Sequence, residues 1–544
     1  MQAPLVIGYD IGTTGAKTCL FRLGERIELL NRVLCEYPLQ ITRDGWAEQN
    51  PDDWWRAMAH GTAEVLRKER VVPDRIRALS FSAGMHSFVP VDKAGTVLRP
   101  AMTYMDQRGG IQRARVLTRP PRVRGMNLFL VCVSLFLAGG VSASVKDPVW
   151  KYLWMRENEP ELFARLAWWL DVRDYLAFRC TGRASMTEDA ANATFLYNTR
   201  RGKPGWSRLL CRWHGVNPSH LPGVTQATAI LGPLIGEAAD NLGLKPGIPV
   251  VGGGGDLTMQ TLGAGCVEPG DTHVYIGTSG WVASVVSRRT LDTRHYMASL
   301  LGARSGYQNY IGEQETSGKC LEWVRDHIAL DEIGIYLSKH PMATDADVRH
   351  ASLLEYLDEV VAQTPAGAGG VIFTPWLHGN RSPFEDPNAR GMFFNLGLNT
   401  GKRQLIRAVV EGMVFQKRWY LECMARKCSI HEPLRFIGGG ALSRATAQIL
   451  ADATGRTVAV IENPQIAGAA GAAVCCGLAL GVYPDFDEIS QSIRTTRLHA
   501  PDSVHREVYE KNYRIFKRLH AANRTNFALA NGEDLRTLSR GSCL

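Results

Sequence analysis

One carboxylate, Asp256, follows a run of four glycines at the end of an apolar stretch. The sequence from 250 to 265 reads VVGGGGDLTMQTLGAG. The apolar residues 248–251 predict a buried strand, and the glycines let the backbone turn sharply and lie against a ligand. Residues 257–262 have helical spacing, which places Asp256 at a helix N-terminus, a common position for chemistry on anions. A plain glycine turn in which Asp256 caps the helix is the alternative interpretation of this stretch.

Two further stretches have the composition of a phosphate-binding hairpin. Asp10 ends a strand-like run and is followed by IGTTGAK, which contains Thr13, Thr14 and Lys17. Residues 276–280, IGTSG, repeat the pattern between two other strand-like runs. Backbone N–H groups, hydroxyls and a lysine gathered at one turn can hold a phosphate. Neither stretch is a P-loop, because a strand rather than a helix is expected to follow.

The repeated hairpin predicts two similar domains that face one nucleotide. A chain of 544 residues is also too long for one core. The order of strands and helices indicates α/β domains with mixed sheets and helices on their faces. We expect an N-terminal domain over 1–267, a C-terminal domain over 268–527 and a tail over 528–544. A third glycine-rich turn from strand to helix, GGGALS, occupies 438–443.

Composition excludes several classes of protein. Hydrophobic residues make up 45% and charged residues 21%, as in soluble globular proteins. The net charge of +9 comes without a nucleic-acid motif, so we expect solvated basic faces and no nucleic-acid partner. Twelve cysteines without a CxxC pair, and an N-terminus that enters a strand at once, indicate a cytoplasmic location. The final Ser-Cys-Leu leaves a peroxisome-type organelle as an alternative.

Taken together, these motifs resemble the FGGY family of carbohydrate kinases, from about residue 5 to about residue 527. The first family signature is present as PVWKYLWMREN at 148–158. The second begins with GMFFNL at 391–396 and continues to 411, with Asn395 where the family usually has glycine. The resemblance implies two ribonuclease-H-like domains of the actin and hexokinase type, with ATP and a sugar in the cleft between them.

The resemblance also implies a phosphotransferase that uses an alcohol group as acceptor, and it gives each motif a role. Asp256 is the implied general base, and Asp10 the implied ligand of Mg²⁺, through water. The implied ATP and phosphate contacts are Thr13, Thr14, Lys17, Gly277, Thr278, Ser279, Gly439, Gly440 and Ser443. An exposed strand lysine is the alternative for Lys17, and a simple helix N-cap is the alternative for Ser443.

Sugar contacts are implied for Met85, His86, Asp106 and Arg108. A histidine and a carboxylate supply the donors and acceptors that a polyol needs, although a lone histidine after a strand is also a common structural residue. The motifs are most similar to those of family members that act on a ketopentose such as D-xylulose. Gluconate and other pentuloses or polyols are alternatives, because Leu257 occupies a position that is generally polar in the family. A catalytically weak sugar-binding regulator is the alternative from another class.

The segment 111–146 departs furthest from the family. An arginine- and proline-rich run at 113–124 precedes 126–145, which contains no charge. About twenty uncharged residues could span a bilayer or imitate a signal peptide. Because the flanking motifs belong to one domain, we expect this segment to pack on the N-terminal domain with no membrane contact. A reading-frame disturbance in the gene is the alternative. A homodimer is also possible among proteins of this kind.

Overall fold

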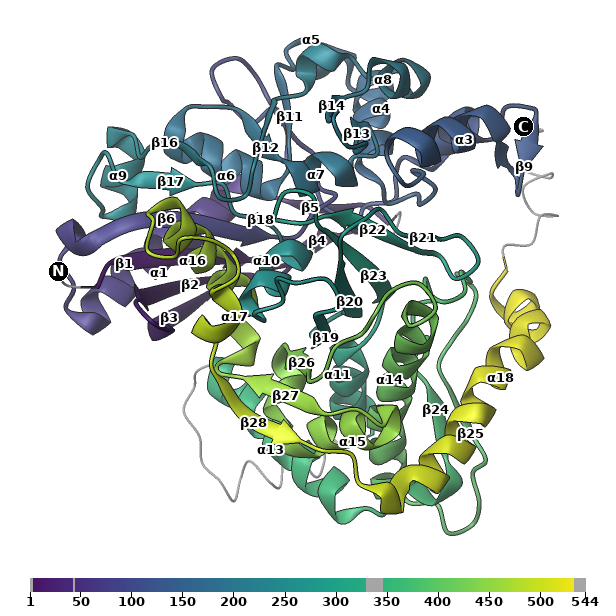
Figure 1. Ribbon diagram of the computed structural model, residues 1–544. Coiled ribbons are helices and arrows are strands. Elements are labelled where there is room, and N and C mark those ends of the chain that lie inside the picture. The colour runs from purple at the N-terminus through teal and green to yellow at the C-terminus, as the bar shows by residue number, and fades with distance from the viewer. Residues whose placement is uncertain (1–2, 43–44, 329–345, 533–544) are drawn as a thin grey trace.

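The computed structural model describes residues 3–42, 45–328 and 346–532. These residues form two lobes, each built on one mixed β-sheet with helices on its faces (Figure 1). The predicted α/β fold with two mixed sheets is therefore confirmed. The calls on the C-terminal residues 542–544 lie outside the described residues.

The two sheets share the order of six strands. The N-terminal sheet runs, in spatial order, β16 (Ile230–Pro233), β17 (Pro249–Val251), β6 (Ile76–Ala83), β1 (Leu5–Ile11), β2 (Gly15–Leu23) and β3 (Ile27–Glu36), and β18 (Gly254–Gly255) also pairs with β6. The C-terminal sheet runs β21 (Leu291–Asp292), β22 (Met297–Leu301), β23 (Gln308–Gln314), β20 (Gly280–Val286), β19 (Thr272–Ile276), β26 (Leu434–Ile437), β27 (Val458–Ile461) and β28 (Thr495–His499). The order β3-β2-β1-β6-β17-β16 of the first sheet corresponds to β23-β20-β19-β26-β27-β28 of the second. In both sheets the strand before the predicted phosphate hairpin pairs antiparallel with the strand after it and parallel with a later strand.

Helices cover both sheets. Those of the N-terminal half are α1 (Pro51–Glu69), α2 (Gly110–Leu117), α3 (Leu128–Leu137), α4 (Pro148–Asn158), α5 (Pro160–Ala164), α6 (Val172–Thr181), α7 (Glu188–Ala193), α8 (Arg208–His214), α9 (Gly236–Leu242) and α10 (Asp256–Gly263). Those of the C-terminal half are α11 (Gly318–His327), α13 (Ala346–Gln363), α14 (Lys402–Met424), α15 (Arg444–Thr454), α16 (Ala467–Ala479), α17 (Ile489–Ser492) and α18 (Arg506–Asn531). Short ladders join loops: β4 (Gln40–Ile41), β5 (Ala47–Gln49) and β8 (Ala101–Met102); β24 (Ile372–Thr374) and β25 (Met392–Phe394); and β9 (Arg122–Val123) and β10 (Met126–Asn127).

Helix α1 illustrates how sequence fixes these elements. Asn50 caps its N-terminus by accepting a hydrogen bond from the Asp52 N–H, and proline occupies the first helical position. The buried face of the helix carries Trp54 and Thr62, and the Thr62 hydroxyl lies 2.8 Å from the hydroxyl of Tyr9 in β1. Burial of this apolar face holds α1 against the N-terminal sheet.

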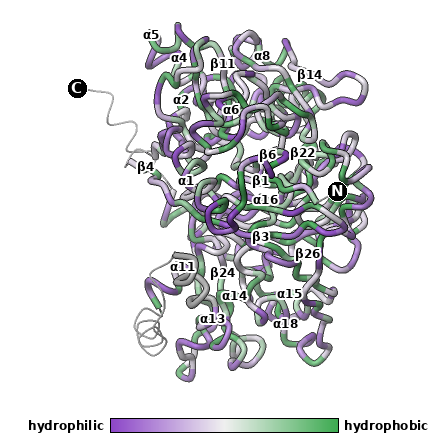
Figure 2. Tube along the Cα trace, turned by 90° about the vertical axis from the view of Figure 1, so that its left-hand side faces the viewer, coloured by the Kyte–Doolittle hydropathy of each residue, from purple (hydrophilic) through white to green (hydrophobic). Residues whose placement is uncertain are grey.

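Helix α16 belongs to the second half of the sequence but packs on the first sheet. It contacts α10 and strands β1, β2 and β6, and Figure 2 shows it at the level of β1, between the two lobes. Small residues allow this contact: a Cβ at Gly263 would lie 1.8 Å from the Ala467 carbonyl oxygen, and one at Gly471 would lie 1.9 Å from that of Met259. The paired helices α10 and α16 therefore join the lobes backbone against backbone.

The atypical segment 111–146 forms α2, the β9–β10 hairpin and α3. Its buried residues Leu117, Leu130 and Ala138 share a core cluster with Trp150 of α4. The segment thus packs on the N-terminal lobe, as expected. No helix of the described chain is long and apolar enough to cross a membrane. One face of α3 nevertheless stays exposed, with Phe129 57% and Phe136 55% accessible.

The other lobe holds the C-terminal end of α3. Arg289 donates to the carbonyl oxygens of Phe136, at 2.9 Å, and Leu137, at 3.5 Å. The last carbonyl groups of a helix lack hydrogen-bond donors within the helix and carry partial negative charge. A guanidinium supplies both the donors and the positive charge. Arg124 makes a similar contact across the lobes, to the Thr293 carbonyl at 3.2 Å.

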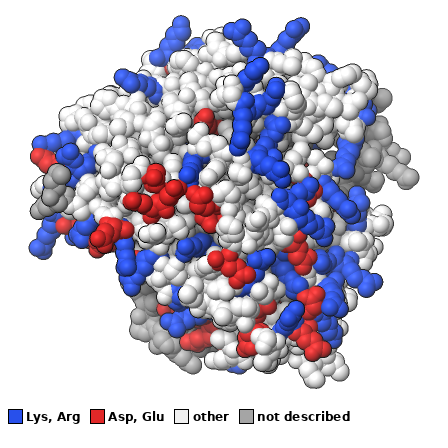
Figure 3. All heavy atoms as spheres, in the orientation of Figure 1, with Lys and Arg blue, Asp and Glu red and all other residues white. Residues whose placement is uncertain are grey.

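Figure 3 shows Lys and Arg side chains spread over one face of the molecule, with acidic side chains among them. Ion pairs such as Arg418 with Glu510 and Lys517 with Glu422 neutralise part of the positive charge. Solvated basic faces without a nucleic-acid partner stay a prediction.

We predict that Arg289→Ala loosens α3. Losing a cation at the helix C-terminus costs about 1 kcal/mol, so the amides of residues 128–138 should exchange with deuterium about fivefold faster. Hydrogen exchange read by mass spectrometry measures this directly. Arg288→Ala, which removes the exposed neighbouring arginine, is the matched control. Equal exchange rates in the two variants would contradict the capping role.

Candidate functional site

Asp256 begins α10, directly after the glycine turn. The turn follows β17 and passes close to β6: Gly253 has a φ of +66°, and a Cβ there would lie 2.1 Å from the Phe81 carbonyl oxygen. The Gly255 N–H donates to the buried carboxylate of Asp189 at 2.8 Å, which fixes the last residue before the helix. The turn is therefore a rigid support for Asp256.

The surroundings of Asp256 disfavour its charge. Burial raises the pKa of Asp256 to about 7, and the charges of Asp10 and Glu313 add to the rise, while the hydrogen bond from the Leu257 N–H at 2.8 Å opposes it. A carboxyl group with a pKa near neutrality is matched to accepting a proton at physiological pH. This is the electrostatic property expected of a general base.

Asp10 lies at the end of β1, opposite Lys17 on β2. The Lys17 ammonium is 3.7 Å from the Asp10 carboxylate and donates to the Gln465 carbonyl oxygen at 3.1 Å. Asp10 also faces the first turn of α16, because a Cβ at Gly468 would lie 2.7 Å from Asp10 Oδ1. The Asp10 carboxylate therefore lies against the N-terminal end of α16.

The first hairpin exposes its hydroxyl residues at the same place. Thr14 is exposed and Thr13 half-buried. The hairpin is closed by a hydrogen bond from the Gly12 N–H to the Gly15 carbonyl oxygen at 2.9 Å. The Thr13 hydroxyl lies 3.3 Å from that of Tyr104. The turn thus offers backbone and hydroxyl groups beside Asp10.

The second hairpin is braced by the start of α11. The Gly318 N–H donates to the Gly277 carbonyl oxygen at 2.6 Å, and the Thr278 carbonyl oxygen accepts from Ser317 and Lys319. Thr278 itself is exposed, and Ser279 is half-buried. The hairpin is held from behind, so its outer edge remains open to a ligand.

The third glycine turn lies against the second hairpin. A Cβ at Gly440 would lie 2.5 Å from the side chain of Ile276, and Gly439 is partly exposed. Ser443 follows as the N-cap of α15: it accepts from the Thr446 N–H at 2.9 Å and donates to Asp358 at 2.6 Å. The sequence-based alternative for Ser443, a helix N-cap, describes its contacts.

Met85 and Leu257 belong to an apolar cluster between the lobes. Leu257 is 3% exposed and packs with Trp281 and Ala283 of the C-terminal sheet, and Met85 packs against them. A Cβ at Gly255 would lie 2.3 Å from the Met85 sulfur, so Met85 also covers the glycine turn. Leu257 therefore contributes to contact between the lobes, and Met85, predicted as a sugar contact, lies in the same cluster.

Asp106 and Arg108 are engaged with each other. Both side chains have 0% exposure, and Arg108 bonds the Asp106 carboxylate through Nε at 2.9 Å and Nη2 at 2.7 Å. Arg108 also pairs with Glu48 at 2.6 Å and lies 3.9 Å above the Trp46 ring. Both side chains are buried and bonded to each other, and direct sugar contact by either one stays a prediction. The pair also fixes the loop that carries Tyr104.

Tyr104 and three residues of the second lobe join the site without having been predicted. Burial raises the pKa of Tyr104, and the charges of Asp256, Glu315 and Glu313 add to the rise, so these groups are neighbours. Arg381 pairs with Glu313 at 2.7 Å. The two glutamates are two residues apart at the end of β23, a spacing that places them on one face of a strand. That alternation is the signal that could have identified them.

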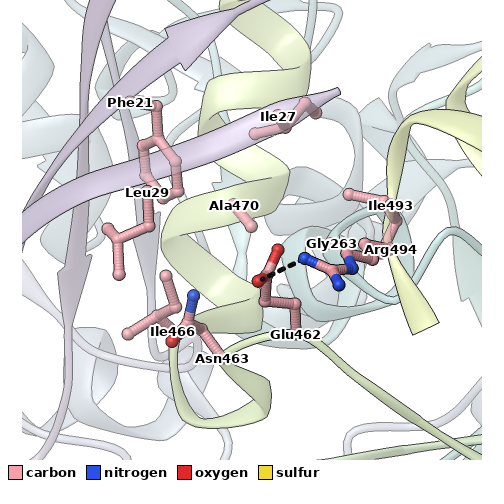
Figure 4. Close-up of a pocket in the computed structure, with 10 residues that line it drawn as sticks. All are labelled: Phe21, Ile27, Leu29, Gly263, Glu462, Asn463, Ile466, Ala470, Ile493 and Arg494. Atoms are coloured by element: carbon pink, nitrogen blue, oxygen red, sulfur yellow. Dashed lines mark hydrogen bonds and ion pairs between the residues drawn. The ribbon is translucent and has the colours of Figure 1, made fainter. Parts of the chain in front are cut away.

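A small cavity lies beside α16 (Figure 4). Phe21 and Leu29 of the N-terminal sheet line it, and Glu462 and Arg494 form an ion pair at 3.5 Å across it. None of the predicted site residues lines this cavity. The residues with chemical functions gather instead between the lobes.

A repeated sheet with a hairpin at each copy, and a buried carboxylate at the junction, define a two-domain α/β protein whose candidate site lies between its lobes. Residues 5–263 match the N-terminal domain of the FGGY family of carbohydrate kinases, and residues 273–480 match its C-terminal domain. The chain belongs to this family of phosphotransferases, which act on an alcohol group and share the actin and hexokinase type of fold. Its substrates are accordingly ATP and a sugar.

The relatives that are similar to this chain include xylulose kinases and gluconokinases. It is 28% identical to the xylulose kinase of Bacillus subtilis, over 95% of this chain and 96% of that one. It is 26% identical to the gluconokinase of the same organism, over 91% of each chain. The structure of a xylulose kinase from Lactobacillus acidophilus superposes with a TM-score of 0.82 at 23% identity, covering 96% of this chain and 99% of that one.

We predict that Gly468→Ala impairs catalysis without unfolding the protein. The added methyl group would lie 2.7 Å from Asp10 Oδ1 and from Ser82 Oγ, so the Asp10 carboxylate must move. A displacement approaching 1 Å at a reacting centre lowers kcat by about 100-fold. Steady-state assays of ADP release would measure the loss.

The matched control is Gly236→Ala, at the first residue of α9, where no atom lies within 4 Å of the added Cβ. This variant should keep full kcat and gain slightly in stability. Wild-type kcat in a correctly folded Gly468→Ala protein would contradict the placement of Asp10 at the reacting centre.

Proposed function

We propose that this chain is a magnesium-dependent kinase that transfers the γ-phosphate of ATP to a hydroxyl of a ketopentose, D-xylulose. Relatives named xylulose kinase, including those of Bacillus subtilis and Escherichia coli, support this choice. The observation that carries the choice of a neutral sugar over an acidic one is the charge balance between the lobes.

Three cations in the cleft are already paired with carboxylates. Lys146 lies 3.0 Å from Glu315, Arg381 lies 2.7 Å from Glu313, and Lys17 lies 3.7 Å from Asp10. Lys151 donates instead to two backbone carbonyl oxygens. A sugar acid would bring another carboxylate next to Asp256, whose pKa is already raised by burial and neighbouring acids. A neutral ketopentose avoids that repulsion.

In this proposal Asp256 orients the reacting hydroxyl and accepts its proton as the phosphoryl group arrives. Thr13, Thr14 and Lys17 stabilise the transferred group from the first hairpin. Gly277, Thr278 and Ser279 contact phosphates from the second. Gly439 and Gly440 let backbone approach the α-phosphate and adenosine, and Ser443 holds the helix that follows.

Asp10 is the residue proposed to hold Mg²⁺. The described residues contain no group of three His, Cys, Asp or Glu that could bind a metal alone. Mg²⁺ is commonly bound by one or two carboxylates together with substrate phosphates, so a single aspartate suits it. The ion neutralises charge on the β- and γ-phosphates when bound.

Gluconate is the second candidate substrate. The gluconokinases of Bacillus subtilis and Bacillus licheniformis are each 26% identical to this chain. Lys146 and Arg381 would contact a substrate carboxylate if it displaced Glu315 and Glu313 from them. A cytoplasmic location completes the proposal, and it suits the cysteines that the structure describes, which form no disulfide.

We predict that Asp256→Asn lowers kcat by about 10²- to 10⁴-fold, because the amide cannot accept the proton. ATP binding should change little, since Asp256 faces the acceptor rather than the nucleotide. Coupled ADP detection and calorimetric titration of ATP measure the two effects. Asp74→Asn, at an exposed ion pair with Lys245, is the control and should keep wild-type turnover.

The wild-type protein is first assayed on D-xylulose, other pentuloses, gluconate, glycerol and polyols. Preference for D-xylulose supports the proposal, and preference for gluconate replaces the neutral sugar with the acidic one. Full turnover in Asp256→Asn would contradict the role of the base. Measurable sugar binding without turnover on any acceptor would favour a regulator of the same fold.

A further inference from the structure

Asp147 occupies the N-cap position of α4 but does not cap the helix. An aspartate at this position ordinarily accepts a hydrogen bond from the second or third helical N–H. Here the side chain turns away: Oδ2 accepts from the Ser144 N–H at 2.9 Å, and no capping bond forms. The carboxylate therefore bonds the preceding loop at Ser144 and leaves the first N–H groups of α4 without a cap.

The second oxygen of this carboxylate has no partner. Asp147 is 1% exposed, and its Oδ1 accepts no hydrogen bond from the described residues. An unsatisfied buried polar atom costs about 1–3 kcal/mol and is rare in native proteins. Burial raises the pKa of Asp147 to about 7, partly opposed by Arg381 and by the Ser144 N–H. A ligand hydroxyl would satisfy Oδ1.

His86 stands beside this unpartnered atom. Its Nδ1 lies 3.6 Å from Asp147 Oδ1, too far for a hydrogen bond between them. An oxygen placed about 2.8 Å from each atom would satisfy both. Burial lowers the pKa of His86 to about 3, with Arg381 and Lys151 adding to the effect, so the imidazole is neutral. A neutral ring with Nδ1 protonated would donate to a hydroxyl that in turn donates to Asp147.

The backbone of His86 is held in a strained conformation. Its φ is +71°, a backbone angle that residues other than glycine rarely adopt. The buried Lys151 ammonium donates to the His86 carbonyl oxygen at 2.6 Å and to that of Lys146 at 2.8 Å. Lys151 thus ties the loop that carries His86 to the residue before Asp147, and it fixes the distance between the two side chains. Such strain is found mainly at functional sites.

The pair faces the same cleft as Asp256. Arg381 of the second lobe acts on the pKa of both Asp147 and His86 and bonds Glu313, whose charge in turn acts on Asp256. The His86 side chain is 19% exposed and Asp147 Oδ1 is buried behind it, so a hydroxyl would approach the pair from the His86 side. Asp147 is the member of the pair that no sequence motif indicated.

We propose that Asp147 is a specificity-determining residue that accepts a hydrogen bond from one hydroxyl of the sugar, with His86 donating to the same oxygen. This inference rests on the proposed function and deepens it. The arrangement selects a neutral polyhydroxylated substrate, because a carboxylate at this position would offer Asp147 no proton and would repel it. The pair would hold the sugar while Asp256 acts on another hydroxyl.

The test pairs enzyme variants with sugar analogues that each lack one hydroxyl. Asp147→Ala and the isosteric Asp147→Asn are assayed with D-xylulose and with each analogue, and sugar binding without ATP is followed by calorimetry. For one analogue, wild-type kcat/KM should fall about 10- to 100-fold, the range for a hydrogen bond to a charged group. Asp147→Ala should lose a similar factor with the full sugar and nothing further with that analogue.

A merely structural role predicts that removing any one hydroxyl lowers kcat/KM by the same factor in the Asp147 variants as in the wild type. That result for every analogue would overturn the inference. Circular dichroism and ATP affinity check that both variants fold. If Asp147→Ala fails these checks, Asp147→Asn carries the comparison. A wild-type protein that binds and phosphorylates none of the sugars would overturn the proposed function itself, and this inference with it.

Discussion

The close contact between α10 and α16 is the constraint on which the rest of the structure depends. The helices approach backbone against backbone at Gly263 and Gly471, where any larger side chain would collide. One end of this pair carries Asp256, and the first turn of α16 faces Asp10. The proposed base and the proposed metal ligand thus take their positions from a single packing contact. The same contact joins the two lobes, which makes it the natural place for relative motion between them.

Charge pairing across the cleft is the second determinant of the site. Lys146 and Glu315 come from different lobes and pair at 3.0 Å, and Arg381 pairs with Glu313 at 2.7 Å. Asp256 lies among other acids instead, and its pKa is raised first by burial and then by the charges of Asp10 and Glu313. A nucleophile-activating carboxylate needs that environment, since a nearby unpaired cation would lower its pKa and weaken it as a base.

Local pattern predicted the parts of the molecule that depend on neighbours in sequence. The two hairpins, the strand before Asp256, and helices such as 467–479 follow from apolar runs and glycines, whose effects act within a few residues. The segment 111–146 shows that such a local pattern does not always predict the structure. Its uncharged run could be a membrane span by composition, yet it folds as a short helix anchored by Leu130 and by Arg289 of the other lobe.

The sequence by itself determined the family and the two-lobed α/β fold, and it predicted part of the residues between the lobes. Only the tertiary structure decided which partners each side chain has. Asp106 is bonded to Arg108, Leu257 packs against Trp281, and Asp147 has an unpartnered oxygen beside His86. The physical reason is that the partners of a side chain come from segments remote in sequence, and packing alone brings those segments together.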